Sequence, residues 1–307
     1  MNLSFLKSID GIILKEDVNL SDYTTFNIGG NCPCVITCSS IKGLEPCIHF
    51  LRQSEIPFLL IGEGSNLLIS DQGFKSVVVR FISKEPDIKM DRFKITASAC
   101  TNLDDVALCA ARNGLKGLNF VSGIPGTVGG AICGNAGAFG QQISDKLFYI
   151  KLLGLNGKKR IVEKDTLEFE YRNSNILKNN DIILSATFNL SFEDPSLLLA
   201  ERTKILKERK EKHPDYKKTP CAGSFFKNIE LDGMRKASGA LLDQAGARKM
   251  SVGGASVFEK HANIIIKKTD QCTAKDVFDL SLEMARAVKK NFNIELKREV
   301  RFVGKFD

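Results

Sequence analysis

The chain has 307 residues, 43% of them hydrophobic and 26% charged, a composition typical of a globular protein with two or three compact units. Its longest apolar runs are far shorter than the ~20 residues that cross a bilayer, and its N-terminus lacks the apolar core of a secretory signal, so we expect neither feature. Nine cysteines, an odd number, indicate reduced thiols and predict a cytoplasmic protein.

Cysteines gather near the N-terminus. Cys32, Cys34 and Cys38 are followed by Cys47 and His49. Thiolates and an imidazole at this spacing could ligate zinc or iron. The apolar residues between the first three favour a buried strand instead, in which a free cysteine acts as a small hydrophobe. We therefore expect no metal.

The first half of the chain reads as alternating short elements. A turn at Gly29 and Gly30 precedes a strand that ends near Cys38, and the proline and caps that follow predict a helix over 45–54. Strands are predicted over 58–61, 67–70, 77–81 and 93–97, and the last two are expected to pair. A helix should follow, capped by Thr101 and Asp104 and ended by Gly114. Further along, we expect a hairpin with a type I′ turn at Asn156-Gly157 and a strand over 182–190.

The second half is predicted to begin with a long helix. Asp194 is a cap and Pro195 a first-turn residue, and the helix should run to about Lys212 and bridge to a second region. That region should hold a short helix over 238–245, a strand over 256–266 and an amphipathic helix over 273–291.

Half of the excess positive charge lies in the second half of the predicted long helix and the residues directly after it. The formal charge is +8, and residues 201–218 contain eight basic and four acidic side chains. Alternating signs at helical spacing favour a solvated helix face. Attraction of a phosphate-bearing ligand is the functional alternative, and nucleic acid is disfavoured because aromatic residues are scarce in the run.

Glycine is concentrated between residues 114 and 140. Nine glycines occur there, at positions 114, 117, 123, 126, 129, 130, 134, 137 and 140. Each weakens regular structure by about 0.5–1 kcal/mol, and the usual reason for accepting this is close approach of bare backbone to a ligand. Apolar side chains between the glycines argue against a flexible linker. The stretch therefore predicts a bound cofactor.

A second glycine motif, GEGSN at 62–66, follows a predicted strand. It is not a P-loop, because no Gly-Lys-Ser/Thr opens a helix, and Leu67 occupies the third glycine position of a dinucleotide fingerprint. The two commonest nucleotide sites are therefore disfavoured.

Five stretches in order then resemble one family, the UDP-N-acetylenolpyruvoylglucosamine reductases (MurB). They are TTFNIGG at 24–30, GEGSNLLISD at 62–71, SGIPGTVGGA with NAGAFG at 122–140, AGSFFKN at 222–228 and EVRFVG at 299–304. The short interval between Arg172 and Ser224 is similar to the subclass that lacks an inserted tyrosine loop. The resemblance covers nearly the whole chain.

The resemblance implies an α+β fold of the FAD-binding, vanillyl-alcohol-oxidase-like (PCMH) type. Two α+β subdomains, 1–80 and 81–195, would hold FAD, and a C-terminal α+β substrate domain, 196–307, would have a last strand that could pack back on the first. NADPH would reduce FAD, and hydride would then pass to the enolpyruvyl ether of UDP-N-acetylglucosamine enolpyruvate, giving UDP-N-acetylmuramate for peptidoglycan. The enzyme would be a monomer or weak oligomer, without nucleic-acid or membrane partners.

The family's motifs assign site residues. Arg172 and Glu299 would stabilise the enolate-like intermediate and Ser224 would donate the proton, whereas composition alone favours an ion pair, a strand-edge charge and a turn hydroxyl. Lys212 and Asn228 match substrate-binding positions. The residues implied for FAD are Gly62, Gly64, Ser65, Asn66, Ser122, Gly123, Ile124, Pro125, Gly126, Thr127, Gly129, Gly130, Asn135, Ala136 and Gly137.

Some positions depart from the family pattern. Gly134 stands where the family often has a methionine, and Ile229 stands where it has a proline. Residues 247–249 differ from the family's usual Gly-Leu-Lys-Gly turn. A covalent flavin link is not expected, although Cys133 lies close in sequence. Two other functions stay open: another FAD oxidoreductase or oxidase of the same fold, and, more remotely, a basic nucleotide-binding module.

Overall fold

The chain folds as interleaved stretches rather than as consecutive domains. The computed structural model describes residues 3–177, 180–231 and 233–306. Two units are formed: unit 1 contains Met1–Lys15, Cys34–Glu63 and Ser76–Arg209, and unit 2 contains Glu16–Pro33, Gly64–Lys75 and Lys210–Asp307. The boundaries expected from the sequence, after residues 80 and 195, stay a prediction.

Unit 1 is built on two large sheets. The first has the spatial order β1-β2-β5-β3, with β2, β5 and β3 parallel. Its strands are β1 (Ile12–Asn19), β2 (Asn31–Cys38), β3 (Phe58–Ile61) and β5 (Val77–Phe81), and β1 and β2 each extend into residues of unit 2. The valine run of β5 is buried, as a central parallel strand requires.

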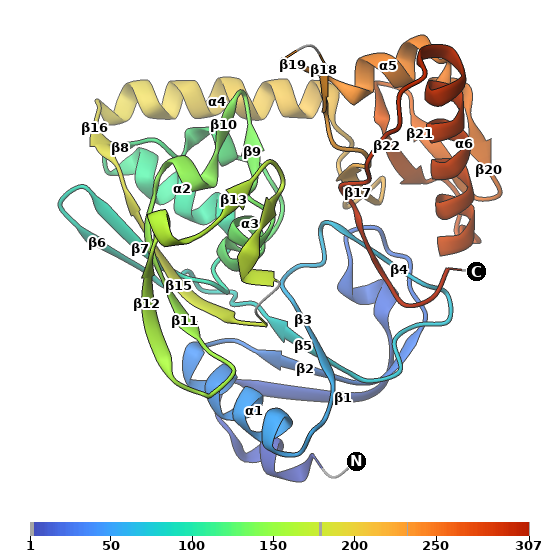
Figure 1. Ribbon diagram of the computed structural model, residues 1–307. Helices are drawn as coiled ribbons and strands as arrows, with labels where there is room; N and C mark the ends of the chain where they lie inside the picture. Colours follow the sequence, from blue (N-terminus) through green and yellow to red (C-terminus); the bar gives the residue numbers. More distant parts are fainter. Residues whose placement is uncertain (1–2, 178–179, 232, 307) are drawn as a thin grey trace. The chain divides into compact units, whose positions relative to one another are not determined.

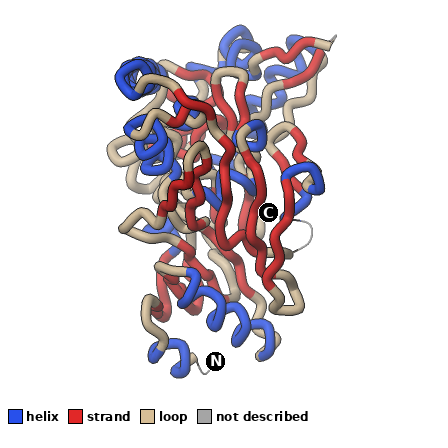
Figure 2. The backbone as a smooth tube through the Cα atoms, turned by 90° about the vertical axis from the view of Figure 1, so that its left-hand side faces the viewer, coloured by secondary structure: helices blue, strands red, loops and turns tan. Residues whose placement is uncertain are grey.

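Helix α1 (Ile41–Gln53) covers one face of this sheet (Figures 1 and 2). The start predicted at residue 45 is wrong, because the Ser40 hydroxyl accepts a hydrogen bond from Gly43 N and caps the helix earlier. Pro46 therefore lies inside α1 and not in its first turn. The buried leucines and isoleucine of α1 offset the hydrogen bond that a proline cannot donate.

The second sheet of unit 1 has the order β12-β11-β15-β7-β6 and is antiparallel. Its strands are β6 (Ile88–Asp91), β7 (Lys94–Ser98), β11 (Leu147–Leu153), β12 (Lys159–Glu163) and β15 (Ile182–Asn189). The predicted pairing of 77–81 with 93–97 is wrong, because β5 and β7 belong to different sheets. Strand β7 instead pairs with β6 and with β15.

The hairpin of β11 and β12 is confirmed, but its predicted turn is wrong. Gly154 N donates to Lys158 O at 3.0 Å, so the loop is longer than the two residues of a type I′ turn. Gly157 takes the left-handed backbone (φ +74°).

Three helices complete unit 1: α2 (Leu103–Arg112), α3 (Val128–Cys133) and most of α4 (Pro195–Lys212). The cap of α2 is Asn102, whose side chain accepts from Asp104 N, and the prediction of Thr101 as the cap is wrong because its hydroxyl donates to Asp87 O. The start and end of α4 are confirmed, with Asp194 accepting from Ser196 N at 2.7 Å.

The shorter elements of unit 1 connect these. They are η1 (Ser4–Ser8), β8 (Leu115–Lys116), η3 (Asn119–Val121), β9 (Gly137–Ala138), β10 (Gln141–Gln142), η4 (Ile143–Asp145), η5 (Lys164–Thr166), β13 (Phe169–Glu170), β14 (Asn173–Ser174), η6 (Asn175–Leu177) and β16 (Ser191–Phe192).

Unit 2 is a four-stranded sheet, β17-β22-β21-β20, with two helices. Its elements are η2 (Leu20–Tyr23), β4 (Leu67–Ile69), β17 (Cys221–Ser224), β18 (Ile229–Leu231), β19 (Met234–Lys236), α5 (Ser238–Gln244), η7 (Ala247–Lys249), β20 (Ser251–Val252), β21 (Ala255–Phe258), β22 (His261–Lys267), α6 (Ala274–Phe292) and β23 (Arg301–Val303). The single strand predicted over 256–266 is wrong, since β21 and β22 form a hairpin there.

The last strand, β23, pairs in parallel with β4, and α6 packs its apolar face into the core of unit 2. The predicted amphipathic face of α6 is confirmed, because Val277, Leu280 and Met284 are all fully buried. None of the helices in the described part of the chain has the length and apolar character needed to cross a bilayer.

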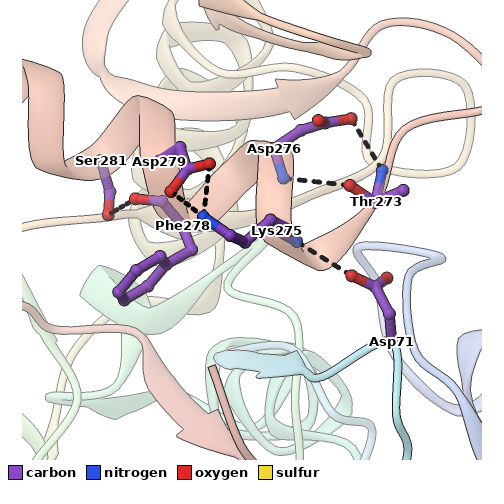
Figure 3. Close-up of polar contacts among 7 residues, drawn as sticks. All are labelled: Asp71, Thr273, Lys275, Asp276, Phe278, Asp279 and Ser281. Atoms are coloured by element: carbon purple, nitrogen blue, oxygen red, sulfur yellow. Dashed lines mark hydrogen bonds and ion pairs between the residues drawn. The ribbon is translucent and has the colours of Figure 1, made fainter. Parts of the chain in front are cut away.

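The N-terminus of α6 is capped from two sides (Figure 3). Thr273 and Asp276 form the predicted capping box, each accepting from the other's backbone N–H at 3.0 Å. The Asp71 carboxylate accepts from Ala274 N at 2.8 Å and from Lys275 N at 3.0 Å. The last residue of the GEGSNLLISD motif therefore has a structural partner, which the sequence did not reveal.

We expect Asp71→Ala to lower the free energy of unfolding by about 1–2 kcal/mol, because two helix N–H groups lose their acceptor and the helix dipole loses a facing anion. Urea denaturation is the measurement. Asp279→Ala on the same helix is the control, since Asp279 makes an exposed i,i+4 pair with Lys275, a kind worth about 0.3–0.5 kcal/mol. Equal effects of the two changes would contradict this role for Asp71.

Candidate active site

Within the glycine stretch, residues 122–127 form a loop between η3 and α3 in unit 1. Gly123 (φ +74°) and Gly126 (φ +132°) both take backbone conformations that favour glycine. Gly126 O accepts from Leu103 N at 2.9 Å, and the Thr127 hydroxyl accepts from Gly130 N at 3.2 Å, capping α3. Helix α3 was not predicted, because glycine is a poor helix former.

Ser122 is fully buried in this loop, and its hydroxyl has no hydrogen-bond partner among the described residues. Buried hydroxyls are almost always paired, so an orphaned one indicates a missing polar partner. Ser122 belongs to the stretch assigned to FAD from the sequence. The loop therefore fits a bound group that supplies a polar atom here.

The glycines have two different explanations. A Cβ on Gly62 would lie 2.6 Å from Thr127 Oγ1, and one on Gly137 would lie 2.5 Å from Gln141 O, so packing within the protein requires these glycines. A Cβ on Gly130 or Gly134 would meet neighbouring atoms only at ordinary contact distance, 3.5 Å. At those two positions the chain itself leaves room, which is the cradle expected for a ligand lying on bare backbone.

Asn135 is buried and takes the left-handed conformation (φ +44°). Its amide nitrogen donates to Gln142 Oε1 and to Glu170 O, and its Oδ1 accepts from Ser144 N. The side chain implied for FAD binding is thus used to shape the loop that follows α3.

Arg172 reaches the same loop from the turn between β13 and β14. Its guanidinium donates to Gly137 O at 2.5 Å and to Asn135 O at 3.4 Å, and it lies over the Tyr171 ring with 5.2 Å to the centroid. Its backbone is left-handed (φ +56°), which is uncommon for a residue other than glycine. Backbone held in such a region is frequent at functional sites.

The GEGSN motif is divided between the units: Gly62 belongs to unit 1, and Gly64, Ser65 and Asn66 to unit 2. Gly64 has φ +67°, and a Cβ there would overlap the Tyr23 carbonyl oxygen. Asn66 Nδ2 donates to Glu299 O at 3.2 Å.

Ser224 and Glu299 come together in unit 2. Ser224 ends β17, beside a bulge at Gly223, and is half-buried. The next carbonyl, Phe225 O, accepts from Glu299 N at 2.8 Å. The two residues, 75 positions apart in the sequence numbering, are therefore joined through one backbone hydrogen bond. Arg172 lies in unit 1.

Asn263 fixes the backbone just after Ser224. It is 2% exposed, its Oδ1 accepts from Phe226 N, and its Nδ2 donates to Phe226 O. Phe225 N donates to Asn263 O at 2.8 Å. Sequence reasoning missed Asn263, and an asparagine within an apolar strand was the available signal.

The predicted substrate residues lie on separate elements. Lys212 ends α4 and is exposed, and Asn228 Oδ1 accepts from Ser238 N at the start of α5. Next to Lys212, the His213 ring contacts the His261 ring, with 5.3 Å between the ring centroids and a 34° tilt between the ring planes. Burial lowers the pKa of His261, and the charges of Arg248 and Lys212 lower it further against an opposing backbone hydrogen bond.

The departures from the family pattern fall in ordered structure. Gly134 is the C-cap of α3, Ile229 begins β18, and Ala247–Lys249 forms η7. Arg248 in that turn pairs with Asp243.

The cysteines of β2 are buried, as are Cys47 and Cys100. A hydrogen bond to Cys38, together with burial, raises the pKa of the Cys47 thiol. Within the described residues, no group of three or more His, Cys, Asp or Glu side chains is placed to hold a metal ion.

Comparison with known proteins identifies the chain. Residues 213–303 match the C-terminal domain of UDP-N-acetylenolpyruvoylglucosamine reductase, and residues 32–161 match the FAD binding domain. The reductase of Clostridium novyi is 37% identical over 97% of this chain and 96% of that protein. This chain belongs to the UDP-N-acetylenolpyruvoylglucosamine reductase family.

Other members agree over the same length. The UDP-N-acetylenolpyruvoylglucosamine reductase of Clostridium beijerinckii is 36% identical over 98% of this chain and 96% of that protein. The crystal structure of the Thermus caldophilus enzyme (MurB) superposes with a TM-score of 0.77 at 29% identity, covering 95% of this chain and all of that one. The α+β FAD-binding fold with a C-terminal domain is confirmed.

The site residues predicted from the family's motifs fall partly inside and partly outside the two matched regions. The FAD binding domain match includes both glycine motifs, and the C-terminal match includes Ser224, Asn228 and Glu299. Arg172 lies in neither match, and Lys212 lies just before the second.

Proposed function

We propose that this protein reduces UDP-N-acetylglucosamine enolpyruvate to UDP-N-acetylmuramate in peptidoglycan synthesis, using FAD and NADPH. The observation that carries the proposal is the match to reductases of this name along almost the full length of both chains. The two alternative functions have no comparable support, because neither accounts for the C-terminal domain match.

Within this proposal, the two glycine motifs bind FAD. The orphaned hydroxyl of Ser122 and the open faces of Gly130 and Gly134 support contact with the cofactor at the loop around α3. Gly64, Ser65 and Asn66 would offer donors to its pyrophosphate. When bound, FAD would take hydride from NADPH and supply it to the β-carbon of the enolpyruvyl ether.

Hydride addition at the β-carbon leaves an electron pair on the α-carbon, delocalised into the carboxylate. Arg172 and Glu299 would stabilise this enolate-like species, and the Ser224 hydroxyl would give its proton to the α-carbon. The backbone hydrogen bond from Glu299 N to Phe225 O, the residue after Ser224, supports a joint role because it holds the two segments next to each other. Lys212 and Asn228 would contact the substrate's phosphate region.

The substrate and NADPH are the proposed partners, and the protein would act in the cytoplasm as a monomer or weak oligomer. The odd number of cysteines, nine in all, supports a reducing compartment.

An absorbance spectrum tests the proposal. The purified protein, or the protein after incubation with FAD, should show flavin bands that bleach when NADPH is added without oxygen and return when the enolpyruvyl substrate follows. A protein that takes up no FAD would contradict the proposal. The proposal would also be contradicted if simple alcohols reduced the flavin and only oxygen reoxidised it. That result would instead support an oxidase of the same fold.

A further inference from the structure

The basic helix α4 turns two of its arginines toward the protein. Arg202 is 7% exposed and Arg209 is half-buried. Both arginines lie in the basic run at 201–218, which was interpreted either as a solvated helix face or as an attraction for a phosphate-bearing ligand. A buried guanidinium needs a partner, because desolvation of a charge is costly.

The partner of Arg202 is Asp104, in the first turn of α2. Arg202 Nη1 donates to Asp104 Oδ1 at 2.8 Å and Nη2 to Oδ2 at 2.7 Å, a bidentate pair. Asp104 Oδ1 also accepts from Gly123 N at 2.7 Å. The carboxylate therefore connects α4 to the loop that carries Ser122.

The charge state of Asp104 follows from these contacts. Burial on its own raises the pKa of the carboxyl. Hydrogen bonds from Arg202 and Gly123, with the charges of Arg202 and Arg209, outweigh burial and hold the pKa below its usual value. Asp104 is thus an anion in any buffer near neutral pH.

Further contacts hold the same segment. Arg209 Nη2 donates to Phe120 O at 3.1 Å, and Asn119 Nδ2 donates to Leu198 O at 3.0 Å and to Glu201 Oε2 at 2.6 Å. A Cβ on Gly123 would lie 2.9 Å from Leu206 Cδ2. Residues 119–123 are therefore fixed along one face of α4.

We propose that Asp104 and Arg202 are positioning residues that hold the loop at 119–123 in the conformation that accepts FAD. The inference rests on the proposed function. Helix α4 lies outside both regions matched by the family models, so this contribution to cofactor binding comes from beyond the matched FAD binding domain. A preformed loop binds more tightly because its ordering cost is met during folding.

The test compares FAD affinity and local exchange in the full-length protein. Asp104→Asn and Arg202→Met are expected to raise the Kd for FAD about tenfold or more, which corresponds to about 1.4 kcal/mol. Hydrogen exchange in peptides covering 119–126 should accelerate without FAD, while exchange in α6 stays unchanged. Asp105→Asn and Lys204→Met are matched controls, because each removes a like charge from the same helix as its counterpart.

A conservative variant separates positioning from general destabilisation. Arg202→Lys keeps the charge but loses the bidentate fork, so FAD affinity and local exchange should fall between wild type and Arg202→Met. If Asp104→Asn and Arg202→Met do not fold, the test rests on Arg202→Lys. An FAD affinity and a local exchange rate equal to those of wild type in this variant would overturn the inference.

The two hypotheses fail differently. Wild-type protein that binds FAD, with Asp104→Asn and Arg202→Met indistinguishable from their controls, would overturn the positioning role alone. Wild-type protein that binds no FAD would overturn both the role and the proposed function.

Discussion

In a protein carrying Ser224→Ala, NADPH is expected to reduce the bound flavin at the normal rate. Product should form about 10²–10⁴-fold more slowly, because this is the usual contribution of a positioned proton donor. A hydroxyl is ordinarily a poor acid, but a carbanionic intermediate is basic enough to take its proton when the two are held in contact. Ser224, the proposed donor, ends β17, and the next residue is tied to Glu299 by a backbone hydrogen bond. Stopped-flow absorbance measures the two half-reactions separately.

Ser251→Ala is the matched control, because Ser251 is an exposed serine in the same sheet of unit 2. It should leave both half-reactions unchanged. Normal reoxidation of the flavin by the substrate in Ser224→Ala would remove Ser224 as the proton donor. Slow reduction by NADPH in the same variant would point instead to a general disturbance of the site.

Gly73→Ala should lower the free energy of unfolding by several kcal/mol or prevent folding. Gly73 has φ +72°, and a Cβ there would overlap the backbone of Asn31 at the carbonyl oxygen. Backbone cannot move aside as a flexible side chain can, so the overlap adds to the ~1 kcal/mol or more that a left-handed non-glycine residue costs. Thermal or urea unfolding measures the loss.

Gly246→Ala separates the two causes. Gly246 has a similar backbone (φ +79°), but a Cβ there would meet no atom within 4 Å. It should therefore cost only the conformational part, about 1 kcal/mol. If the two substitutions cost the same, the predicted overlap at Gly73 is relieved by a small shift of the loop.

Elements whose ends are marked by local chemistry could be predicted from the sequence. Helix α4 begins at Pro195 directly after the capping Asp194, and α6 begins directly after its cap Thr273, as expected from capping. The errors in strand pairing arose where distant residues decide. Whether β5 pairs with β7 depends on which strands compete for its edges, and β2 and β3 take both.

The sequence predicted which motifs belong to the candidate site, but it did not predict the contacts that these motifs make. The motif order placed Ser224 and Glu299, but their connection through Phe225 O requires the fold. The pairing of Asp104 with Arg202, 98 positions apart, leaves no local signal, because a charged residue in a basic helix is normally solvated. Asn135 was assigned to the cofactor, and its side chain has its hydrogen bonds within the protein.

The pairing of β4 with β23 also determines when this region can form during synthesis. Asn66 donates to Glu299 O across 233 positions, and Leu67 pairs with Arg301, so β4 is made long before its neighbour β23. A ribosome makes about 5–20 residues per second, so β4 spends at least several seconds without its neighbour. A nascent chain can therefore bring the segments of Ser224 and Glu299, the two residues proposed for catalysis in unit 2, to their final places only after β23 has been made.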